Sequence, residues 1–164
     1  MLLPAHEGDP PAQLHGGSPH IRRYLTCHHE AGHAIVALAL GLDVVHVILE
    51  DPKVTGRYGS TRILGPVTTT TAPAWGAALT AGHLASARAA AELGVQVPPE
   101  GHSSDDDHDR WCEWVEPHGI DLWDAIVTAN HTLTAHWPDV RKLAHELRAH
   151  GHVDVAQWIQ ENPL

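Results

Sequence analysis

Residues 28–34 read HHEAGHA, inside the longer stretch RRYLTCHHEAGHAIVALALG at residues 22–41. On an α-helix, positions i and i+4 share one face, so His29 and His33 can direct a ring nitrogen at one metal ion. Glu30 lies one position round the helix, where its carboxylate can take a proton from a metal-bound water. The stretch therefore predicts a zinc site carried on one helix, with Glu30 as the general base.

The flanks of this stretch predict a helix that begins at residue 19 and ends near residue 40. Ser18 suits the N-cap position and Pro19 suits the first turn. Gly41 suits the position just beyond the last turn, where a left-handed backbone is common. Apolar or small residues recur at helical spacing and indicate an amphipathic helix. They are Ile21, Leu25, Gly32, Val36 and Ala39.

These residues also resemble a known family. Residues 22–41, with two arginines, HEAGHA and an apolar run, are similar to the protease-domain helix of the FtsH family of ATP-dependent zinc metalloproteases. GLDVVHVILE at residues 41–50 and GRYGSTRI at residues 56–63 resemble the next two strands of that family. The resemblance spans residues 20–160. It implies an FtsH-protease-like bundle with a small β-hairpin or sheet at its edge, a zinc cofactor, and an oligomeric ring as a possible assembly.

The resemblance further implies that the third zinc ligand is an aspartate at the start of a later helix. Four aspartates crowd that place, Asp105, Asp106, Asp107 and Asp109, within SSDDDHDRWCEWVEPHG at residues 103–119. Helical periodicity favours Asp107, because it shares a face with the apolar residues four, seven and eight positions later. Asp106 and Asp105 remain alternatives, and Asp105 has the better spacing from the preceding loop. Three protein ligands would leave a fourth position for water.

The rest of the chain predicts an α+β fold that is mainly helical. We expect a flexible leader at residues 1–17 and a single domain at residues 18–164. Strands are expected at residues 44–49 and 58–64, joined by a loop, because both segments are rich in β-branched or apolar residues. Helices are expected at residues 71–93, after Asp121, and from Pro138 to residue 150, followed by a short closing segment. His83 is more typical of a polar helix contact than of a metal ligand.

Composition limits the partners and the compartment. The formal net charge is −10, with 10 Lys and Arg against 20 Asp and Glu, which argues against binding nucleic acid or an anionic membrane through bulk charge. Cys27 and Cys112 form no C-x-x-C pair, so we expect two small buried side chains in a reducing compartment. No apolar run approaches the ~20 residues of a membrane span. The expected location is the cytoplasm.

Together these features predict a zinc-dependent metalloendopeptidase of the HExxH type, in which His29, His33 and an aspartate hold zinc and Glu30 is catalytic. The sequence has no Gly-rich phosphate loop, so we expect a stand-alone peptidase domain without the ATPase module or membrane anchor. The expected partner is a polypeptide substrate or a specific protein, which could pair with residues 57–62 as an added strand. The alternative is a non-catalytic, zinc-stabilised binding or regulatory module, which a protein ligand in the fourth position would indicate.

Overall fold

The computed structural model describes the backbone of residues 18–96 and 102–164, and the side chains of residues 18–96 and 106–164. The expected leader at residues 1–17 lies outside this range. The elements are α1 Pro19–Ala39, β1 Asp43–Leu49, α2 Pro52–Thr55, β2 Gly59–Leu64, α3 Ala72–Leu93, α4 His102–Arg110, the π-helical turn η1 Trp111–Val115, the 3₁₀ turn η2 Glu116–His118, α5 Leu122–Ala135, α6 Trp137–His150, β3 His152–Asp154 and α7 Val155–Glu161. The fold is mainly helical with a small antiparallel sheet, as predicted.

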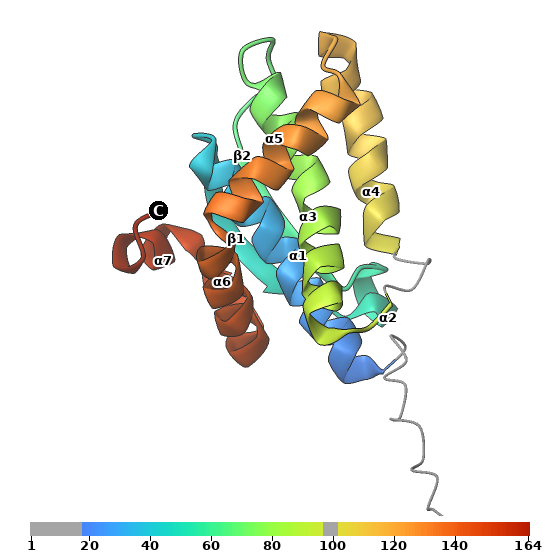
Figure 1. Ribbon diagram of the computed structural model, residues 1–164, viewed down its shortest axis with the longest axis vertical. Helices are drawn as coiled ribbons and strands as arrows, with labels where there is room; N and C mark the ends of the chain where they lie inside the picture. Colours follow the sequence, from blue (N-terminus) through green and yellow to red (C-terminus); the bar gives the residue numbers. More distant parts are fainter. Residues whose placement is uncertain (1–17, 97–101) are drawn as a thin grey trace, which may run out of the picture.

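Helix α1 runs through the middle of the molecule and packs against α3, α5, α6 and the sheet (Figure 1). It begins at Pro19 and ends in a Schellman motif, in which Gly41 has φ +83° and donates its N–H to the Leu38 carbonyl. Every residue from 27 to 37 is buried. The amphipathic pattern therefore describes only the ends of α1, because neighbouring elements cover its central turns on all sides.

Small residues allow α1 and α3 to approach closely. A Cβ atom added at Gly32 would lie 2.5 Å from the Ala85 Cβ and 2.9 Å from the Ala81 carbonyl oxygen. Seven of the 12 buried residues of α3 are alanine, and these small side chains let α3 pack closely against α1. This close packing fixes α3 directly beside the histidines of α1.

The three-stranded sheet has the order β2-β1-β3, so β2 is an edge strand as expected. The strands β1 and β2 pair antiparallel from Asp43 opposite Leu64 to Leu49 opposite Gly59, with an irregularity near Val45. Strand β3 pairs with the other edge of β1, where Val153 lies opposite Val47. The closing segment therefore contains a strand that its short sequence did not predict.

Two smaller expectations differ from the structure. The segment expected as a loop between the two strands contains the short helix α2, capped by the Asp51 side chain, which accepts from the Lys53 N–H. Cys27 is buried as expected, but Cys112 is exposed on the outer side of η1. None of the helices in the described part of the chain is long and apolar enough to cross a membrane.

Candidate metal centre

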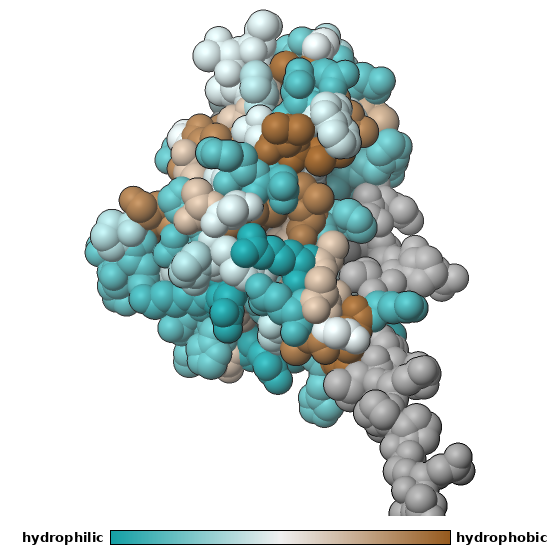
Figure 2. Space-filling view, viewed as in Figure 1, coloured by the Kyte–Doolittle hydropathy of each residue, from teal (hydrophilic) through white to brown (hydrophobic). Residues whose placement is uncertain are grey.

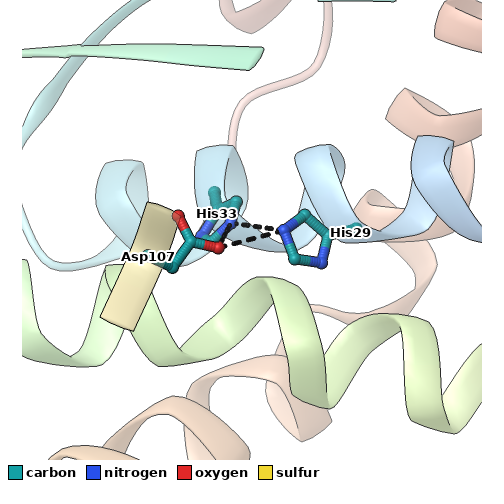
Figure 3. A group of neighbouring side chains, drawn as sticks. All are labelled: His29, His33 and Asp107. Atoms are coloured by element: carbon teal, nitrogen blue, oxygen red, sulfur yellow. Dashed lines mark hydrogen bonds and ion pairs between the residues drawn. The ribbon is translucent and has the colours of Figure 1, made fainter. Parts of the chain in front are cut away.

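His29, His33 and Asp107 meet at one point between α1 and α4 (Figure 3). The His29 Nε2 and His33 Nε2 atoms are 2.9 Å apart, and each lies 3.1 Å from the Asp107 Oδ2 atom. All three side chains are at least 85% buried. A tetrahedral zinc ion with bonds of about 2.0–2.2 Å separates its ligand atoms by roughly 3.3–3.6 Å, so a small outward shift of these donor atoms would accommodate one such ion.

Each donor is positioned by the element that carries it. The two histidines are one helical turn apart on the rigid, buried part of α1. The His33 Nδ1 atom donates to the Ala78 carbonyl oxygen of α3 at 2.6 Å, which leaves Nε2 as the nitrogen that faces Asp107. Arg110 holds the other end of the carboxylate, with its Nη1 atom 3.6 Å from the Asp107 Oδ1.

The absence of a side chain at Gly82 leaves room beside these donors. A Cβ atom added there would overlap the His33 ring, lie 2.5 Å from its Cε1 atom, and lie 2.8 Å from the His29 Nε2. The donors therefore converge on a space that α3 keeps open, as a site for an ion requires.

The charges of the cluster are strongly coupled. Burial alone would lower the pKa of His33, but the nearby Asp107 carboxylate raises it to about 9. Burial alone would raise the pKa of Asp107, but the imidazoles of His33 and His29 hold it well below its usual range. Without a metal, the cluster therefore holds an imidazolium beside a carboxylate. A divalent ion would replace that proton.

Two residues of the edge strand β2 contact Glu30 and position its side chain. The Thr61 Oγ1 atom lies 2.8 Å from the Glu30 Oε2 and 3.0 Å from the Glu30 carbonyl oxygen, so its hydroxyl can donate to either. A Cβ atom added at Gly59 would lie 2.9 Å from the Glu30 Cγ. Residues 59 and 61 lie on the same side of β2. The Thr61 hydroxyl and the close backbone of Gly59 together fix the position of the Glu30 carboxylate.

Glu30 and the three donors share one cleft of about 310 Å³. Strand β2 forms one wall, and the start of α3 together with α4 and η1 forms the other. The lining residues are His29, Glu30, His33, His46, Arg57, Gly59, Ser60, Thr61, Arg62, Ile63, Trp75, Leu79, Asp106, Asp107, Arg110 and Trp114. The cluster is therefore reachable from solvent, alongside an open strand edge.

The structure brings Asp107, the aspartate favoured by periodicity, to the two histidines. Asp106 instead points to Arg57, with 4.0 Å between the Asp106 Oδ2 and the Arg57 Nη1. The side chain of Asp105 lies outside the described residues. His83 is exposed, and within the described residues the metal-binding group contains only His29, His33 and Asp107.

Sequence reasoning missed Thr61, Gly59, Gly82 and Arg110 as parts of the site. The alternation of side chains along β2 could have placed residues 59 and 61 on one face, but not above Glu30. The spacing of Arg110 from Asp107 is i, i+3 on one helix, a pattern typical of an ion pair. Nothing local could have indicated the role of Gly82, since its neighbours come from α1.

Comparisons of this chain with models of protein families, with curated proteins and with solved structures find no match. The fold and site define a mainly helical α+β protein with a candidate metal centre built from two histidines and an aspartate.

The coupled pair predicts how the stability of the metal-free protein depends on pH. A raised His33 pKa contributes stability that is complete below about pH 6.5 and is lost as the pH rises to about 9. A lowered Asp107 pKa contributes stability above about pH 4 that is lost as the pH falls below it. Chelator-treated protein should therefore lose unfolding free energy between pH 6.5 and 9, at up to about 1.4 kcal/mol per pH unit.

Denaturant titrations of Asp107→Asn should show this slope much reduced, because the carboxylate that raises the His33 pKa is gone. Asp109→Asn makes the same charge change at an exposed position of the same helix and should keep the slope. Equal slopes in the wild type and Asp107→Asn would mean that the pair is not formed in solution.

Proposed function

We propose that the chain is a zinc-dependent metallopeptidase whose zinc is held by His29, His33 and Asp107. The observation that supports this most is the convergence of three buried donor atoms within 3.1 Å of one another, at the floor of an accessible cleft. The order of residues in HEAGH and the resemblance to the FtsH protease helix favour the same function. We also propose that the helical bundle has the FtsH-protease architecture.

In this proposal zinc, when bound, supplies the Lewis acidity that activates water near neutral pH and polarises the scissile carbonyl. Glu30 accepts the proton of the attacking water at its carboxylate and then donates that proton to the departing amine. His33 keeps its Nε2 atom directed at the centre through its bond to the Ala78 carbonyl. Arg110 holds the outer oxygen of Asp107 and so fixes the rotation of that carboxylate.

The open edge of β2 favours an extended polypeptide as the substrate. Its residues 59–63 line the cleft beside Glu30, and a substrate backbone could add to this edge as a further strand. Such pairing selects unfolded or flexible segments, because a folded chain cannot present an isolated strand.

The proposal is tested by metal analysis and by hydrolysis of an unfolded polypeptide. The expected result is one tightly bound zinc ion per chain and hydrolysis that stops on chelation and returns with zinc. Tight binding of one zinc without hydrolysis would instead support a zinc-stabilised binding module. Several weakly bound ions per chain would contradict both functions.

The hydrogen bond from Thr61 to Glu30 predicts the effect of Thr61→Val. Valine keeps the shape of threonine but cannot donate, so the Glu30 carboxylate would lose one of the contacts that position it. We expect kcat to fall about tenfold with unchanged zinc content, as for the loss of one hydrogen bond to a charged group. Thr61→Ser retains the hydroxyl and should restore most of the rate. A valine variant as active as the wild type would rule out this positioning role.

A further inference from the structure

A second pocket, of about 550 Å³, lies between the first half of α1 and α6. The side chains that matter for its chemistry are Tyr24, His28 and Trp137, which form its aromatic part, and Arg141, Lys142 and Arg148, which bring positive charge. It shares no lining residue with the metal cleft. The surface over α6 is strongly hydrophilic in Figure 2. This pocket is therefore separate from the metal cleft, and its lining combines aromatic rings with cationic groups.

The charge of this pocket is unusual for an acidic chain. Three of the 10 Lys and Arg residues line it, whereas the chain has 20 Asp and Glu residues and none of them lines it. In the described part of the chain, Arg141, Lys142 and Arg148 have no carboxylate within ion-pair distance, unlike Arg57, Arg88 and Arg110. Among the described residues, the Lys142 ammonium donates to the Asn162 side chain alone. The guanidinium groups of Arg141 and Arg148 are therefore available to an anion from solution, and Lys142 adds positive charge beside them.

The acidic group that is bonded to Trp137 of this pocket is paired elsewhere. Glu92 accepts from the Trp137 Nε1 atom at 2.7 Å and lies 3.8 Å from the Arg88 Nε. The Arg88 guanidinium covers the Trp137 ring at 4.3 Å, and the Arg148 guanidinium covers the Tyr24 ring at 5.7 Å. The aromatic side chains therefore hold Arg148 in place at the pocket and keep Glu92 and Arg88 paired with each other.

His28 adds a buried polar atom to the same pocket. Only 4% of this residue is exposed, and its ring lies between those of Tyr24 and Trp137. Its Nδ1 atom is 2.9 Å from the Tyr24 carbonyl oxygen and must donate, because a carbonyl only accepts. The Nε2 atom then offers a lone pair and has no hydrogen-bond partner among the described residues. A ligand that fits this pocket carries a hydrogen-bond donor as well as negative charge.

We propose that this pocket binds inorganic phosphate. The hydrogen phosphate ion combines charged oxygens, which arginine guanidinium groups bind in a forked geometry, with a P–OH group that can donate to the His28 Nε2. The pocket is lined by three cations and by no carboxylate. Its charge therefore matches a divalent anion better than a monovalent ligand such as a carboxylate. Sulfate has the same shape and charge but no hydroxyl group. A phosphate monoester near neutral pH is mostly doubly ionised, so few of its molecules carry a P–OH group.

The test is calorimetric titration of the zinc-loaded protein with sodium phosphate, sodium sulfate and methyl phosphate at one ionic strength and at pH 7.5. Phosphate should bind more tightly than either of the other anions. Arg141→Gln and Arg148→Gln should each weaken phosphate binding about tenfold, the loss expected for one charged hydrogen bond. Lys53→Gln makes the same charge change at an exposed site on α2, which lines neither pocket, and should change the affinity less than twofold.

Three outcomes would overturn the proposal. Sulfate that binds as tightly as phosphate would remove the role of the P–OH donor. An equal loss in Lys53→Gln and Arg141→Gln would show attraction to overall charge and not to this pocket. Phosphate binding that survives Arg141→Gln but disappears on chelation of zinc would place the anion at the metal centre. Thermal melts of each variant establish that it is folded before titration, and Arg148→Lys provides a charge-preserving second variant at that position.

Discussion

Replacing Glu30 by glutamine should abolish hydrolysis while the protein keeps its zinc. Glutamine has the size of glutamate and can still accept the hydrogen bond from Thr61, so the packing below β2 should survive. It cannot take a proton from the attacking water. Loss of a general base reduces rates by about 10²–10⁴-fold, and we expect kcat/KM for an unfolded polypeptide to fall within this range. None of the metal donors is altered.

The measurement pairs hydrolysis rates with zinc content for the wild type and Glu30→Gln. Glu113→Gln makes the same charge change at an exposed position of η1 and serves as the matched control, with unchanged activity. Equal hydrolysis by the wild type and Glu30→Gln would mean that Glu30 is not the base. Zinc binding by both proteins, with no hydrolysis by either, would favour the binding module.

Adding a single methyl group at Gly82 should remove zinc binding. Alanine normally stabilises a helix interior by about 1 kcal/mol relative to glycine, so the intrinsic effect on α3 is favourable. Here the added Cβ would occupy the space between the two imidazoles, 2.8 Å from the His29 Nε2 and in contact with the His33 ring. The Ala78 carbonyl holds His33 in place, and the contact at Gly32 prevents α3 from withdrawing without repacking.

We expect the zinc affinity of Gly82→Ala to fall about 100-fold, the upper end of what overpacking of a rigid site costs. Competition with a chromophoric chelator measures this directly. Ala91→Ser adds one heavy atom to an exposed position of the same helix and should bind zinc as the wild type does. If Gly82→Ala bound zinc with wild-type affinity, the ion would not occupy the space that this glycine keeps open.

Most of the expected elements could be predicted from local patterns. The bounds of α1 and α3 follow from Ser18, Pro19 and Gly41, and from Pro73 and Gly94, because capping depends on a few neighbouring residues. Strand β3 was missed because three residues carry too little pattern without their partner strand. The exposure of Cys112 was not predicted. Only one side of η1 is buried, and the number and spacing of the cysteines do not show on which side Cys112 lies.

The sequence alone determined the pair of histidines and the neighbouring glutamate, since the 3.6-residue period of a helix brings positions i and i+4 together wherever the helix lies. It also ranked Asp107 above its neighbours by the same periodicity. Only the tertiary structure decided that the Asp107 carboxylate reaches those histidines, that Thr61 holds Glu30, and that Gly82 leaves the space open. Each of these depends on how segments far apart in the chain pack, and packing distances are not encoded in any local spacing.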